Sequence, residues 1–162
     1  MADVFAIAKT IETEGRDHYR ALAASTDNRE IAGVFRYLAD EEEKHYRLFD
    51  RMQKKLPAEP FDPSDVLQKA KAAFQSMSAA VQTAGTGDAE SAYRKALAFE
   101  QKSVDFYEKV LKDESAADQA GTIALVLGEE RKHVRLVEAL VDFVRRPKEW
   151  LENAEFNHLD EY

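Results

Sequence analysis

The sequence predicts an all-α protein, a four-helix bundle of two duplicated helical hairpins joined by a long crossover that contains a short helix. Only four prolines and six glycines interrupt long stretches rich in Ala, Leu, Glu, Lys and Arg, which is a helical composition. Apolar residues recur three and four positions apart, and no stretch alternates as a strand does. A pattern of charged and aromatic residues also repeats after 88 residues, which indicates an internal duplication.

Size and composition narrow the class of protein. A chain of 162 residues is expected to form one domain. Its formal charge of -8 argues against nucleic acid or an anionic membrane as a partner and is compatible with binding cations. The absence of cysteine excludes disulfides, thiol catalysis, zinc ribbons, iron–sulfur clusters and rubredoxin-type iron sites. With neither a signal-peptide pattern nor a membrane span, a cytoplasmic protein is expected.

The first hairpin is predicted over residues 3–56. Asp3 is placed to cap its first helix. Asp27 and Glu30 form a capping-box pattern, which predicts the start of the second helix. Basic residues followed by Pro57 mark the end of that helix.

The crossover is predicted over residues 57–87. A short helix with an apolar face is expected to begin at Asp62-Pro63 and to lie against the bundle. The two helices of the second hairpin are expected to begin near Asp88 and near Ser115.

The bundle domain is predicted over residues 1–147, followed by a tail over residues 148–162. The tail has too much apolar surface for a free segment, so it is expected to dock on the bundle or on a second subunit. Its apolar residues are Trp150, Leu151, Phe156, Leu159 and Tyr162. We therefore expect a homo-oligomer, with a dimer as the first expectation.

Two Glu-x-x-His motifs give the main chemical signal. Residues three apart lie on one face of a helix, so each motif presents a carboxylate and an imidazole side by side. Another glutamate stands thirty residues before each motif, on the apolar seam. The six residues are Glu12, Glu42 and His45 in the first hairpin and Glu100, Glu130 and His133 in the second. Each hairpin turns midway between its two glutamates, so all six groups are expected in one interior layer.

A metal site accounts for this layer. An unpaired carboxylate in an apolar seam costs several kcal/mol or stays protonated, and four in one layer cost more. Two divalent cations would balance four carboxylates, and a donor set of one nitrogen and several oxygens per metal suits iron or manganese. The alternative is that glutamate is abundant and a lone motif arises by chance. The matched spacing of all six groups favours the metal site.

At these residues the chain resembles the rubrerythrin-like branch of the ferritin-like diiron-carboxylate proteins, over roughly residues 3–146. The resemblance implies a ferritin-like bundle that holds two iron ions, with manganese as the alternative. It implies bridging by Glu42 and Glu130, terminal ligation by Glu12 and Glu100, and one metal each for His45 and His133. Leu97 stands where rubrerythrins carry an additional glutamate. A cysteine-free chain also lacks the rubredoxin domain of many relatives, so electrons are expected from another protein.

Four residues near the terminal glutamates have two interpretations each. Tyr19 and Tyr107 are expected to face the interior. They would either be core aromatics or act on the site, by hydrogen-bonding a ligand or passing an electron. Gly15 and Ser103 are small, so they would either leave a cavity for a small oxidant or allow close helix packing.

Other polar residues are expected to have no part in the site. His18, Asp17 and Asp105 are expected in solvent, and His158 is not expected to be a ligand. Of the acidic run 41–43, only the middle member is expected to turn inward.

The function that the resemblance implies is that of a non-haem diiron oxidoreductase reducing hydrogen peroxide. In that chemistry the diferrous pair gives two electrons to the peroxide bond, and an external donor protein resets the site. One alternative is oxidation of ferrous iron, by oxygen or peroxide, for storage or transfer. Another is a structural or interaction module that metal merely stabilises.

Overall fold

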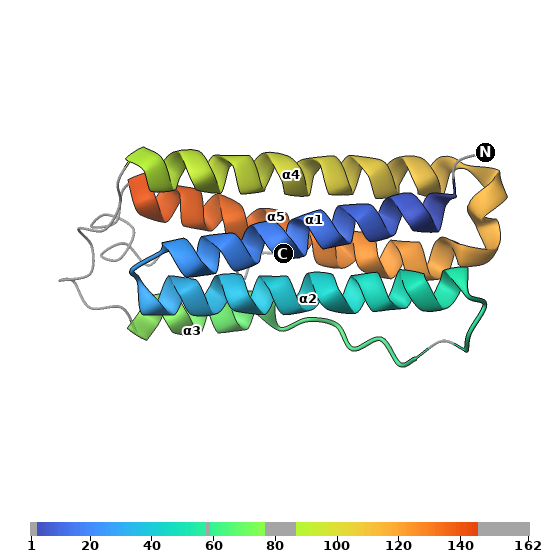
Figure 1. Cartoon of the computed structure of the whole chain (residues 1–162), viewed down its shortest axis with the longest axis horizontal. Coiled ribbons are helices and arrows are strands. Elements are labelled where there is room, and N and C mark those ends of the chain that lie inside the picture. The colour runs from blue at the N-terminus through green and yellow to red at the C-terminus, as the bar shows by residue number, and fades with distance from the viewer. Residues whose placement is uncertain (1–2, 58, 77–86, 146–162) are drawn as a thin grey trace.

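The computed structural model describes residues 3–57, 59–76 and 87–145, and these residues form helices without any strand. The helices are α1 (Val4–Ser25), α2 (Arg29–Gln53), α3 (Val66–Ser76), α4 (Gly87–Lys112) and α5 (Ala120–Arg145), with a short 3₁₀ helix, η2 (Glu114–Gln119), before α5. Figure 1 shows the four long helices lying side by side, with the crossover running back along α2 into α3. The predicted all-α bundle of two hairpins is confirmed.

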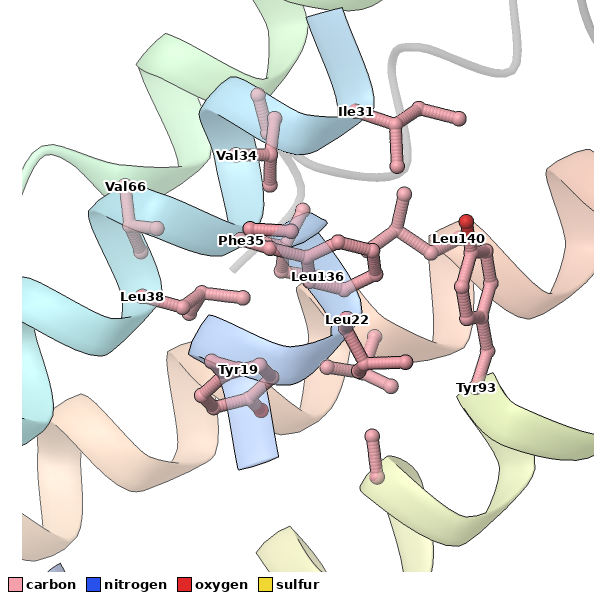
Figure 2. Close-up of a cluster of buried hydrophobic side chains, with 14 of the residues drawn as sticks. Tyr19, Leu22, Ile31, Val34, Phe35, Leu38, Val66, Tyr93, Leu136 and Leu140 are labelled. Carbon is pink, nitrogen blue, oxygen red and sulfur yellow. The ribbon is translucent and has the colours of Figure 1, made fainter. Parts of the chain in front are cut away.

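The bundle interior consists of two apolar clusters at opposite ends of the long helices. The first lies where α1 turns into α2, and Figure 2 shows Tyr19, Phe35 and Leu136 converging there from three helices. The second joins the start of α1 and the end of α2 to the end of α4 and the start of α5, with Phe49 and Tyr107 at its centre. The polar residues of the two motifs occupy the layer between these clusters.

Three predicted helix starts are wrong. The cap of α2 is Asn28, whose side chain accepts a hydrogen bond from the Ile31 backbone N–H at 3.0 Å, whereas Asp27 is exposed one residue too early. The crossover helix begins at Val66 instead of at Asp62-Pro63, because contacts with the bundle hold the preceding residues extended. The last helix begins at Ala120, after the 3₁₀ turn that occupies the expected start.

Some expectations lie outside the described residues. The apolar face predicted for the crossover helix extends to Met77 and Val81, and both residues belong to this group, as does the whole tail over residues 148–162. The division into a domain over residues 1–147 and a tail therefore stays a prediction. Within the described residues, every helix is too short or too polar to cross a bilayer.

The cap at Asn28 can be tested against its neighbour. Replacing Asn28 with alanine removes the acceptor for the Ile31 N–H and should lower the free energy of unfolding by about 1 kcal/mol. Replacing the exposed Asp27 with alanine should change it by less than about 0.5 kcal/mol. Urea unfolding of both variants measures the difference, and a larger loss at Asp27 would contradict the assignment.

Candidate metal centre

The six motif residues lie together in the middle of the bundle. Helix α1 supplies one glutamate, α4 supplies another, and α2 and α5 each supply a glutamate and a histidine. None of the six exposes more than 2% of its surface. The expected convergence in one interior layer is therefore present in the fold.

His45 faces carboxylates from both hairpins. Its Nδ1 atom lies 3.2 Å from Oε2 of Glu12 and 2.9 Å from Oε1 of Glu130. Oε2 of Glu42, one turn earlier on the same helix, is 3.9 Å away. Together these four residues form a buried group whose ligand atoms all lie within 4.8 Å of one another.

The second half repeats this arrangement around His133. Its Nδ1 atom lies 3.0 Å from Oε1 of Glu42 and 3.7 Å from Oε1 of Glu100. A second group of four therefore comprises His133, Glu100, Glu42 and Glu130. Glu42 and Glu130 belong to both groups, and they come from different hairpins. The arrangement is that of two adjoining sites with two shared carboxylates.

The unsatisfied atoms of this layer fit a pair of cations. Oε1 of Glu130 has no hydrogen-bond partner among the described residues, although it lies 2.9 Å from Nδ1 of His45. The contact is thus a close approach of two potential ligand atoms without hydrogen-bond geometry. Oε2 of Glu100 is likewise buried and unpartnered within the described part of the chain. Oxygen and imidazole donors of this kind suit iron and manganese.

Burial and mutual repulsion dominate the electrostatics of three glutamates. Burial raises the pKa of Glu42 well above its ordinary value, and the negative charges of Glu130 and Glu12 raise it further. The pKa values of Glu100 and Glu130 are also raised, mainly by burial. Without metal, these carboxyls therefore hold their protons to a higher pH in the folded state than in the unfolded chain.

The first half holds a charged pair. Burial acts to raise the pKa of Glu12, but hydrogen bonding to His45 and its positive charge outweigh burial and lower it. Conversely, burial acts to lower the pKa of His45, and the carboxylates of Glu12 and Glu130 raise it well above its ordinary value. Burial lowers the pKa of His133, which favours its neutral imidazole.

Tyr19 and Tyr107 each contact the centre across the bundle. The hydroxyl of Tyr19 donates a hydrogen bond to Oε1 of Glu100, and that of Tyr107 donates to Oε1 of Glu12. Burial raises the pKa of both phenols well above the ordinary value, so both remain donors. Each ring also stacks on a core phenylalanine. The two tyrosines thus serve at once as core aromatics and as hydrogen-bond donors to the centre.

Gly15 allows close packing. A β-carbon at this position would lie 3.0 Å from Cε1 of Phe99 and 3.3 Å from Cδ of Glu42. The space beside Gly15 is thus filled by an aromatic ring on one side and by a shared carboxylate on the other. At the related position, the hydroxyl of Ser103 donates to the Phe99 carbonyl one turn back. Of the two interpretations of these small residues, the geometry favours packing over a cavity.

Two buried glutamates flank the centre, and the first of them was expected in solvent. Glu41 is 1% exposed and lies 2.6 Å from the ammonium group of Lys44. At the duplicated position, Glu129 is 3% exposed and lies 2.7 Å from Lys132. The expectation for the acidic run 41–43 was wrong for its first member. The matching i,i+3 lysines were the available signal, because each neutralises a glutamate beside the motif.

His18 also departs from its expected place in solvent. It is half-buried, its Nε2 atom has no hydrogen-bond partner among the described residues, and burial lowers the pKa of its imidazole. Asp17 and Asp105 are exposed, as expected, and His158 lies outside the described residues. Leu97 is partly buried and packs on the first apolar cluster.

The packing at Gly15 can be tested against an open glycine. Replacing Gly128, which has no neighbour within 4 Å, with alanine should stabilise α5 by about 0.5–1 kcal/mol. Replacing Gly15 with alanine should raise the free energy of unfolding by less, because the new methyl group presses on Phe99 and Glu42. Replacing Gly15 with leucine should also reduce bound metal. Thermal melts and elemental analysis measure both effects, and a leucine variant with full metal content would contradict the close packing.

The raised carboxyl pKa values predict a pH effect on metal-free protein. Glu42, Glu100 and Glu130 hold protons in the fold at pH values where the unfolded chain has lost them, so stability falls as pH rises above the ordinary carboxyl range. The raised pKa of His45 acts in the same direction, and the lowered pKa of His133 partly opposes it. The metal-free protein should therefore melt lower at about pH 8 than at about pH 5.5.

Metal-loaded protein is the control for this pH effect, because bound cations displace these protons and should weaken or reverse the fall in stability with rising pH. Melting curves at both pH values, with and without metal, make the comparison. Identical pH dependence in the two forms would show that these carboxyls are not the cause.

Comparison with known proteins gives one match. The family model described as Rubrerythrin matches residues 3–141, which include all six residues of the centre, both tyrosines and the crossover. No curated protein and no solved structure matches the chain.

Proposed function

We propose that this chain, which belongs to the rubrerythrin family, binds a pair of non-haem iron ions in its buried centre and reduces hydrogen peroxide. The observation that carries the proposal is the pair of four-residue groups that share Glu42 and Glu130. A closed structural site needs only one ion with a full set of ligands. Two adjoining sites with shared carboxylates suit a two-electron reaction instead.

The proposed ligand set follows the two groups. Glu42 and Glu130 would bridge the ions. Glu12 and His45 would complete the first site, and Glu100 and His133 the second. Both imidazoles would bind through Nδ1, since these atoms face the carboxylates. Manganese suits the same donors, and iron is favoured by the family.

The chemistry requires two electrons and two protons for each peroxide. Two ferrous ions would supply one electron each, so that hydrogen peroxide and two protons become two water molecules. The chain's own residues hold the charge: four carboxylates balance the cations in a layer that excludes water. Tyr19 and Tyr107 keep one oxygen of Glu100 and one of Glu12 in a hydrogen bond, which orients the remaining oxygen of each.

Two partners are part of the proposal. The oxidised centre must regain two electrons, and we assign this step to a separate electron-donor protein. We also propose that the protein forms a homo-oligomer, and a dimer is the first state to test.

The proposal predicts two iron ions per chain and rapid oxidation of the reduced protein by hydrogen peroxide. Replacing Glu42 and Glu130 together with alanine should remove both ions, because each site loses both shared ligands. Elemental analysis after anaerobic reconstitution gives the stoichiometry, and stopped-flow absorbance gives the oxidation rate.

Glu43→Ala is the matched control, because Glu43 adjoins Glu42 but pairs with Arg16 outside the centre. It should keep both ions. Oxidation that is fast only with oxygen, with many irons turned over per chain, would replace peroxide reduction by iron oxidation and storage. Tight metal binding without reaction toward either oxidant would indicate a structural site.

A further inference from the structure

The crossover places an aromatic ring against the centre. Residues 59–65, which we call the strap, run back along α2 in the extended segment between α2 and α3 (Figure 1). Within the strap, the ring of Phe61 stacks on the imidazole of His45 with 6.2 Å between centroids and 22° between planes. Phe61 is partly buried and packs against the second apolar cluster. It therefore separates His45 from the surface on this side.

Contacts with the bundle hold the strap on both sides of Phe61. Before the ring, Arg51 forms an ion pair of 3.0 Å with Glu59. After it, the Ser64 backbone N–H donates to Glu129 at 3.0 Å, and Lys132 donates to the Ser64 carbonyl at 3.3 Å. The buried Glu129 thus fixes the end of the strap. These contacts hold Phe61 in place as a positioned barrier.

A pocket of about 220 Å³ lies directly outside this barrier. Its lining combines apolar and charged side chains from α2 and the strap: Lys44, Arg47, Leu48, Arg51, Glu59 and Phe61, among others. Phe61 therefore contacts the pocket with one part of its ring and His45 with another. The pocket adjoins the centre with one ring in between.

The charged side chains around the pocket favour binding of a neutral molecule over an anion. Each of its three cations has a carboxylate partner, with Lys44 2.6 Å from Glu41 and Arg47 3.1 Å from Glu43. Arg51 is neutralised by the strap glutamate described above. The lining also includes the carboxylate of Asp62, so the pocket does not attract anions, and a neutral molecule enters it more readily than an anion. Hydrogen peroxide and small alkyl hydroperoxides are neutral and polar, which suits such a lining.

We infer that Phe61 is the gate through which a neutral hydroperoxide reaches the His45 side of the centre, and that its ring sets the size of hydroperoxide admitted. This inference rests on the proposed function for the identity of the visitor. The duplication relates the strap to residues 147–153, which lie outside the described residues, so the inference concerns the His45 half alone.

The test compares a small and a large oxidant. Reduced, iron-loaded full-length protein is mixed in stopped flow with hydrogen peroxide or with tert-butyl hydroperoxide. Phe61→Ala should raise the rate with tert-butyl hydroperoxide by roughly tenfold or more relative to hydrogen peroxide, because removing the ring admits the larger molecule. Phe61→Trp should slow both oxidants, and it provides a readout should the alanine variant fold poorly.

Two phenylalanines serve as controls. Phe5 is also partly buried against the second apolar cluster but lies seven residues from Glu12, so Phe5→Ala matches the loss of packing without opening the pocket. Phe99 lies beside Gly15 and does not line the pocket. An unchanged selectivity in both Phe61 variants, or a larger change in Phe99→Ala than in Phe61→Ala, would overturn the inference.

Metal extraction separates this inference from the proposed function. Anaerobic removal of ferrous iron by the neutral chelator 2,2′-bipyridyl requires access but no turnover. Phe61→Ala should accelerate extraction and Phe61→Trp should slow it. If the Phe61 variants change the rate of iron extraction but peroxide does not oxidise the protein, the gate would be supported and peroxide reduction rejected. Rapid peroxide oxidation with no response at residue 61 would do the reverse, and protein that binds no iron would reject both.

Discussion

The burial of four carboxylates and two imidazoles in one layer is the constraint on which the rest of this structure depends. Charge cannot stay in such a layer without compensation, so protons or cations must enter with the carboxylates. The raised pKa values of Glu42, Glu100 and Glu130 show how protons provide this compensation when metal is absent. The two apolar clusters, one on each side, supply the burial that holds the layer closed.

The surroundings of the layer are adapted to it. Gly15 is small because Glu42 and Phe99 occupy the space that a side chain would fill. Two further buried carboxylates, Glu41 and Glu129, lie just outside the centre. Each is neutralised by a lysine one turn later. Glu129 also fixes the crossover, so the charge balance and the cover of the centre depend on the same residue.

The features predictable from sequence were those with a period or a repeat. Helical spacing identified the two hairpins, and the shift of 88 residues identified all six buried groups of the centre. The start of α2 was missed because Asp27 and Asn28 are equally good caps by type, and only the backbone path decides between them. Phe61 was missed because it lies in an aperiodic connection, where no pattern indicates what a side chain will contact.

The depth of Glu41 and Glu129 could not be read from composition either. A run of three glutamates normally lies in solvent, and a lysine three residues after Glu41 is a weak signal against that, so it took the tertiary arrangement to show that two members of the run face inward. The crossed contacts of the tyrosines are similar: spacing placed Tyr19 near Glu12 along one helix, yet its hydroxyl contacts Glu100 on the other hairpin. Contacts between repeats depend on how the repeats dock, which a sequence period does not specify.

These crossed contacts have an evolutionary consequence. His45 meets Glu130, His133 meets Glu42, Tyr19 meets Glu100 and Tyr107 meets Glu12, so each pair joins one hairpin to the other. A two-fold symmetric association of two identical hairpins would contain every one of these pairs. Fusion of two such copies into one chain would leave the centre symmetric while freeing everything around it to diverge. The strap lies in the linker that such a fusion would create, so it could evolve without a matching change inside either hairpin.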